Sequence, residues 1–206
     1  MDAQLRRLSS SALLLLTLAL WPAIAAADTR TDARRYFNRA LELTPRYGYL
    51  RINLGILDAA TGDKAGAERE LRLAVELDPG NPEPHYHLGR FLRDEGRLDE
   101  ARRSAERALA LAGGHSHARQ LLRDTLLDLS LRGYQEQRFE ASLDDARRAL
   151  AVDPRSDLAC NNIVAALNAL GRWDEAVAAG ERALELNPKN ERARANLAWA
   201  RQHQAR

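Results

Sequence analysis

One spacing recurs along most of this chain and limits what it can fold into. Small residues, nearly all alanine, return at intervals of 34, 34, 41 and 34 residues. They are Ala33, Ala67, Ala101, Ser142 and Ala176. A second series follows the same intervals through Ala40, Ala74, Ala108, Ala149 and Ala183. A fixed period of this length is typical of proteins built from similar repeats, each of which packs against its neighbours. We therefore expect a row of repeats and not one irregular core.

Each repeat has the pattern of two short amphipathic helices. Leu50, Leu54 and Leu57 are spaced three or four residues apart, as are Leu71 and Ala74, so each set lies on one helical face. A residue that ends a helix follows the second pattern in every repeat. These residues are Pro45, Pro79, Gly113, Pro154 and Pro188. One repeat is therefore helix, turn, helix, turn, which predicts an all-α fold.

Local motifs in two repeats carry a family resemblance. The first copy reads Leu88-Gly89, Gly96-Arg97-Leu98, Ala101, Ala108-Leu109, and the second reads Gly171-Arg172-Trp173, Ala176, Ala183-Leu184, Pro188. This spacing resembles the tetratricopeptide repeat family. The resemblance implies a right-handed α-solenoid of antiparallel helix pairs, in which the first helix of each pair lines a concave groove.

The period divides residues 28–206 into partial and full repeats. We expect a half repeat at 29–45, full repeats at 46–79, 80–113, 114–154 and 155–188, and a closing helix at 190–206. The third full repeat is seven residues longer than the others. Seven residues make almost two α-helical turns, so we expect a long first helix from Ser116 to Arg132 and not a loop. Gln137 stands where other repeats have a turn glycine, which leaves that bend less well defined.

The first 27 residues have the pattern of an export signal. Arg6 and Arg7 precede an apolar stretch from Ala12 to Leu20, and small residues end the segment at Ala27. Such a segment is typical of a cleavable secretory signal peptide. The apolar stretch is shorter than the ~20 residues of a membrane-spanning helix. We expect cleavage after Ala27, location in the bacterial periplasm, and membrane contact only through the signal.

Composition excludes several classes of function. Lys and Arg total 31 against 29 Asp and Glu, and this near balance gives no large positive field for nucleic acid. The single cysteine, Cys160, excludes an intramolecular disulfide and a multi-thiolate metal site. We expect it to be buried in the fourth full repeat, with an intermolecular disulfide or a redox role as the alternative. The familiar nucleotide-binding, hydrolase and calcium motifs are absent, so we predict a protein that is not an enzyme and has no cofactor.

The groove predicted from the resemblance carries aromatic, amide and charged side chains. The candidate peptide-binding residues are Tyr49, Asn53, Tyr86, His87, Arg90, Asp128, Tyr134, Asn162, Asn196 and Trp199. Five of them share one phase of the repeat, and three of those five are asparagines. A carboxamide can accept from a peptide N–H and donate to a peptide C=O, so this line could hold an extended peptide. The alternative is that these are solvated or locally bonded helix residues.

These observations favour a noncatalytic scaffold that binds a protein or an extended peptide, within an envelope assembly, secretion or maturation system. A cell-wall glycan-binding accessory protein is one alternative, and a metal-handling protein is another. The latter would use His85, His87, His115 and His117. Residues two apart on a helix point about 200° away from each other, so neither histidine pair can chelate a metal from regular helix, and we predict no metal site. The partner and the oligomeric state stay open.

Overall fold

The computed structural model describes residues 27–204, and these residues form ten α-helices and no strand. The expected signal peptide lies outside the described residues except for Ala27, its last position. Within residues 27–204 no helix has both the length and the apolar content needed to cross a bilayer. The described residues form two compact modules, an N-terminal module that ends at Pro79 and a C-terminal module that begins at Gly80.

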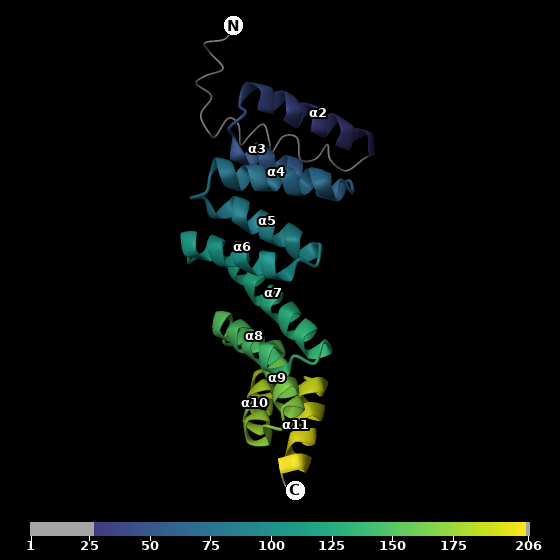
Figure 1. The fold of residues 1–206 in the computed structure, drawn as a ribbon, viewed down its shortest axis with the longest axis vertical. Helices are drawn as coiled ribbons and strands as arrows, with labels where there is room; N and C mark the ends of the chain where they lie inside the picture. Colours follow the sequence, from purple (N-terminus) through teal and green to yellow (C-terminus); the bar gives the residue numbers. More distant parts are fainter. Residues whose placement is uncertain (1–26, 205–206) are drawn as a thin grey trace. The chain divides into compact units, whose positions relative to one another are not determined.

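The N-terminal module contains a single helix followed by a helical hairpin (Figure 1). Its helices are α2 (Ala27–Leu43), α3 (Gly48–Ala60) and α4 (Lys64–Leu77). Phe37 and Leu41 of α2 are buried against Leu50 and Leu54 of α3. The expected half repeat is therefore one helix whose apolar stripe is covered by the first helix of the next repeat.

The C-terminal module is a series of helical hairpins closed by one more helix (Figure 1). The helices are α5 (Pro82–Asp94), α6 (Leu98–Leu111), α7 (Ser116–Gln135), α8 (Phe139–Val152), α9 (Asp157–Ala169), α10 (Trp173–Leu186) and α11 (Glu191–Gln204). Each first helix contacts the next first helix, in the order α5, α7, α9 and α11. These four helices therefore form one layer, and α6, α8 and α10 pack beside it.

The long helix of the third full repeat is continuous. α7 begins at Ser116 and runs to Gln135, which confirms a long first helix and extends it three residues beyond the expected end. Its buried face includes Leu122, Leu126 and Leu129. Because the seven extra residues make nearly two turns, the apolar face stays in register on both sides of the insertion.

Two kinds of residue set the ends of the helices. Asp63, Asn81 and Ser156 accept a hydrogen bond from a backbone N–H in the first turn of the helix that follows, which satisfies donors that a helix leaves unpaired. The turns inside the hairpins need a left-handed residue. Glycines supply it in the first, second and fourth full repeats, and Gln137 adopts a φ of 58° in the third. The bend at Gln137 therefore has the same handedness as the glycine bends.

Candidate functional site

Large apolar side chains are exposed on the first helices of the C-terminal module. Leu131 and Tyr134 of α7, Leu158 of α9 and Trp199 of α11 are all exposed. Among the described residues of the second helices α6, α8 and α10, no large apolar side chain is exposed. Among the described residues of the C-terminal module, large exposed apolar side chains therefore lie on the first helices, the layer that the sequence predicted to line a groove.

The asparagines on this layer are bonded to one another. Asn196 donates to the Asn161 side chain at 3.1 Å, and Asn168 donates to the backbone carbonyl of Asn196 at 2.9 Å. Asn162 lies 3.5 Å from the Ser130 hydroxyl. These contacts join α9 to α11 and α7 to α9. Asn162 and Asn196 each use one donor to link neighbouring helices, as in the alternative of locally bonded residues, and peptide binding by the amide line stays a prediction.

Asp128 and His87 also face neighbouring groups. Arg93 of α5 donates to the Asp128 carboxylate at 2.7 Å, so this carboxylate is neutralised within the module. The side chain of His87 is 19% exposed. Burial, with smaller contributions from Arg90, His115 and His117, lowers the pKa of His87 to about 4. His87 is therefore neutral near pH 7, while the guanidinium of Arg90 is exposed beside it.

Three histidines and a tyrosine form an aromatic cluster between α5 and the start of α7. The Tyr86 ring centroid is 4.9 Å from that of His87, 5.4 Å from His115 and 5.9 Å from His117. His115 caps α7 by accepting from Ala118 N through Nδ1. In neutral His115 the proton is then on Nε2, which lies 3.2 Å from the Glu83 carboxylate.

The contacts of His115 leave it without a nitrogen for a metal ion. His115 Nδ1 is used by the helix cap and its Nε2 carries the proton, so neither nitrogen has a free lone pair for a cation. Within the part of the chain that the structure describes, no group of three His, Cys, Asp or Glu side chains is placed to hold a metal ion.

Exposed aromatic rings lie on α11, α7 and α3. Trp199 is half-exposed, at 52%, and its ring centroid lies 4.0 Å from that of His203, which in turn lies 5.0 Å from Trp173. Tyr134 packs edge-on against Phe139. In the N-terminal module, Tyr49 is 43% exposed beside Tyr47, and Asn53 is partly buried one helical turn further along α3.

Comparison with known families decides what this repeated hairpin is. One tetratricopeptide repeat model matches residues 23–82 and 127–191, more than half of the chain. A second tetratricopeptide repeat model matches residues 65–125. The chain belongs to the tetratricopeptide repeat family. The expected fold class, an all-α solenoid of this type, is confirmed.

Curated relatives match only part of their own length. The peroxisomal targeting signal receptor of Candida glabrata is 40% identical over 75 residues, which are 36% of this chain and 13% of that protein. A probable biofilm formation methyltransferase, WspC of Pseudomonas putida, is 37% identical over 93 residues, which are 45% of this chain and 22% of that protein. The chain therefore matches less than a quarter of the length of either relative.

Solved structures share the fold at low sequence identity. The crystal structure of MamA matches with a TM-score of 0.58 at 22% identity, over 77% of this chain and 82% of that one. YrrB, described as a TPR protein with an unusual peptide-binding site, matches with a TM-score of 0.57 at 20% identity, over 82% and 84% of the two chains. These similarities establish the fold and nothing more specific.

Sequence reasoning missed two features of this tetratricopeptide repeat surface. Leu158 was not expected in the groove, although it lies one turn before Asn162 and has the phase of Tyr49. The cluster of His87 with His115 was missed because each histidine pair was considered within its own helix. Cys160 is buried, as expected, and burial raises the pKa of its thiol.

Proposed function

We propose that this tetratricopeptide repeat protein is a noncatalytic scaffold whose layer of first helices binds an extended segment of another protein. The observation that carries the proposal is the confinement of Leu131, Tyr134, Leu158 and Trp199 to that layer. Exposed apolar side chains gathered on one face and interleaved with polar groups mark an interaction surface. The description of YrrB as a TPR protein with a peptide-binding site supports peptide binding by this fold.

The side chains of this surface indicate which kinds of residue a bound peptide should carry. Aromatic and leucine side chains would supply the apolar contacts. The unused lone pairs of Asn162 and Asn196 would accept from peptide N–H groups, each hydrogen bond adding only about 1 kcal/mol. Arg90 adds one exposed positive charge. We therefore expect a peptide with spaced apolar side chains, and a preference for an acidic residue near α5.

A matched pair of variants tests this surface. Leu131→Asn/Leu158→Asn/Trp199→Asn removes apolar contacts from the first helices. Ala141→Asn/Ala151→Asn/Ala178→Asn places the same residue at three exposed positions of α8 and α10. On an array of 15-residue peptides drawn from cell-envelope proteins, we expect the first variant to lose at least tenfold in affinity for the bound peptides and the second to keep it. Equal affinities for both variants and the unmodified chain would contradict the proposal.

We further propose that the protein acts in the periplasm, in an envelope assembly, secretion or maturation complex. The support is the sequence of residues 1–27, with its charged start, short apolar stretch and small residues before Asp28. N-terminal sequencing of the protein from a periplasmic extract tests this location. A mature chain that begins at Asp28 is expected, and recovery of the intact chain from the cytoplasmic fraction alone would refute it.

The ring cluster at α11 favours glycan binding as a second candidate. Trp199, His203 and Trp173 place aromatic faces close together with Trp199 half-exposed, and exposed aromatic rings can stack on sugars. Retention on purified cell-wall glycan, lost on Trp199→Ala, would favour this function. Retention that is unchanged by Trp199→Ala would argue against the ring cluster as its cause.

A further inference from the structure

A carboxylate in the N-terminal module lies at a position where other repeats bury an apolar residue. Asp58 of α3 is 2% exposed, and the residues at the same phase in the second and fourth full repeats are Leu92 and Leu167, each 1% exposed. Leu, like Asp, branches at Cγ, and it is the uncharged residue that two other repeats place at this phase. Burial raises the pKa of Asp58 despite the opposing effect of Arg34, so the ionised carboxylate is held at a cost in free energy.

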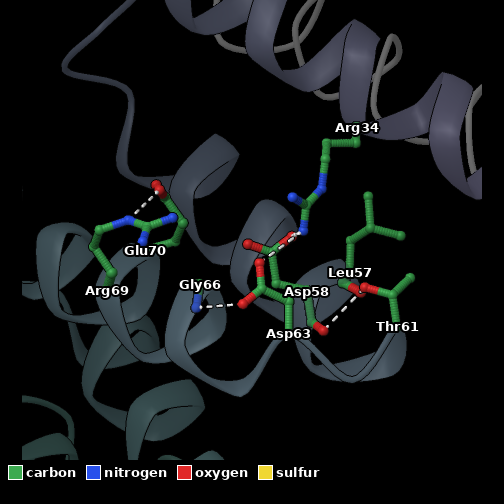
Figure 2. A network of polar contacts seen from close by, with 8 residues as sticks. All are labelled: Arg34, Leu57, Asp58, Thr61, Asp63, Gly66, Arg69 and Glu70. Carbon is green, nitrogen blue, oxygen red and sulfur yellow. Dashed lines mark hydrogen bonds and ion pairs between the residues drawn. The ribbon is translucent and has the colours of Figure 1, made fainter.

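An arginine from α2 neutralises this carboxylate. Arg34 Nη2 contacts Asp58 Oδ1 and lies 3.3 Å from Asp63 Oδ2 (Figure 2). Asp63 is held in turn by the backbone N–H of Gly66 at 2.9 Å. A Cβ at Gly66 would lie 2.4 Å from Asp63 Oδ2 and 2.7 Å from Asp58 Oδ2. The glycine therefore makes room for two carboxylates that converge on one guanidinium.

The other repeats lack this arrangement. Arginines occupy the phase of Asp63, at Arg97, Arg138 and Arg172. In two of those repeats a glutamate, Glu100 or Glu175, stands at the phase of Gly66. Glu70 of α4 is also close to the site, and its negative charge further raises the pKa of Asp58. Arg51 and Arg69 pair with Glu70, and Arg34 is the cation that α2 brings to Asp58 itself.

Apolar contacts complete the interface between α2 and α3. Arg34, Phe37 and Leu41 follow one another at spacings of three and four residues, so they lie on one face of α2. Phe37 and Leu41 are 5% and 7% exposed against leucines of α3. Among the described helices, α3 is the one with which α2 makes an extensive contact, whereas α11 contacts both α9 and α10. One interface therefore holds α2 in place.

We propose that this face of α3 is a docking site selective for amphipathic helices with the pattern Arg-x-x-Phe-x-x-x-Leu, the pattern of α2, which occupies it. Asp58 sets the selectivity, because a helix that brings no cation would leave it buried and unpaired. A helix of this pattern matches the site in charge and in apolar spacing. This surface is separate from the proposed peptide groove, so either proposal can fail without the other.

The direct test releases α2 from α3 in the full-length chain. Phe37→Asp/Leu41→Asp removes the apolar contacts of α2 with α3. A labelled peptide of residues 27–43 serves as the probe. A second peptide carries Arg34→Met, and both are titrated into chains with Asp58 or with Asp58→Leu. We expect the arginine peptide to bind the Asp58 chain about tenfold or more tightly than the methionine peptide, and the preference to vanish on Asp58→Leu. The same preference on both chains, or no binding to a folded chain, overturns the proposal.

A second measurement covers the case in which the Phe37→Asp/Leu41→Asp chain does not fold. In the otherwise unmodified chain, hydrogen exchange of the amides of residues 33–43 reports how firmly α2 is docked. Arg34→Met should speed this exchange about tenfold, and Arg34→Met/Asp58→Leu should return it to within about twofold of the unmodified chain. Unchanged exchange in Arg34→Met, or a double variant no better than the single one, overturns the proposal.

Discussion

At the scale of single residues, Gln137 has a left-handed backbone conformation that favours glycine. Its φ of 58° is the left-handed conformation that Gly62, Gly96 and Gly171 adopt in the other hairpin turns, and a residue with a Cβ is strained there by roughly 1–2 kcal/mol. We expect Gln137→Gly to raise the free energy of unfolding by about 1 kcal/mol, after the larger chain entropy of glycine in the unfolded state is subtracted. Urea denaturation measures the change.

The control for this prediction is the same substitution two residues earlier. Gln135 ends α7 in helical conformation and is exposed, so Gln135→Gly should lower stability by roughly 0.5–1 kcal/mol. Opposite signs for the two variants are the expected result. If both variants lower stability, relief of strain at Gln137 is not the dominant effect.

His87 makes the stability of the C-terminal module depend on pH. Its pKa is about 4 in the folded chain, mainly because of burial, against 6.5 unperturbed. The unfolded chain therefore binds the proton first as the pH falls. The contribution of neutral His87 to the free energy of unfolding is fully present above pH 6.5. It decreases by up to about 3 kcal/mol as the pH falls from 6.5 to 4. We expect the free energy of unfolding to fall over that range.

His87→Asn isolates this contribution, since other repeats carry asparagine at the same phase. The carboxylates titrate in both proteins and largely cancel when the two are compared. The difference in unfolding free energy between the unmodified chain and His87→Asn should change by up to about 3 kcal/mol from pH 6.5 to 4, in the direction that favours the variant at acid pH. A difference that stays constant with pH would contradict the prediction.

At the scale of helices, close packing depends on residues without a side chain. A Cβ at Gly55 of α3 would lie 2.8 Å from Leu71 Cγ and 3.2 Å from the Ala67 carbonyl oxygen of α4. We expect Gly55→Ala to lower the free energy of unfolding by roughly 1–3 kcal/mol, because the two helices must separate. Gly114→Ala, where nothing lies within 4 Å of the added atom, should change it little. Equal effects in urea denaturation would refute the packing argument.

The helices themselves could be predicted from sequence because their causes are local. The period placed the helical hairpins, and the seven extra residues predicted the long α7, since a whole number of turns keeps its apolar face in register. The side-chain contacts of the candidate site, in contrast, join residues of neighbouring helices, so they do not follow from the local sequence. Asn196 meets Asn161 across 35 residues of sequence, and Asp58 meets Arg34 across 24. A single helical wheel shows that these side chains are polar and gives no partner for them.

At the scale of the whole molecule, repeats that touch only their neighbours should transmit a perturbation over a short range. Gly180 of α10 tests this within the C-terminal module, because an added Cβ there would lie 2.9 Å from Leu197 Cβ of α11. α11 contacts α9 and α10, so Gly180→Ala should weaken the docking of α11. We expect amide hydrogen exchange to quicken at least tenfold in α11 and less in α9.

The distant hairpin of the same module supplies the decisive comparison. α5 and α6 are two repeats away from Gly180, and nearest-neighbour coupling predicts that their exchange stays within about twofold of the unmodified chain. Ala178→Ser, at an exposed position of the same helix, controls for a change in α10 itself and should leave α11 unaffected. If exchange in α5 and α6 instead rises by the same factor as in α11, the module unfolds as one cooperative unit. A substitution in one repeat would then destabilise all the repeats of the module together.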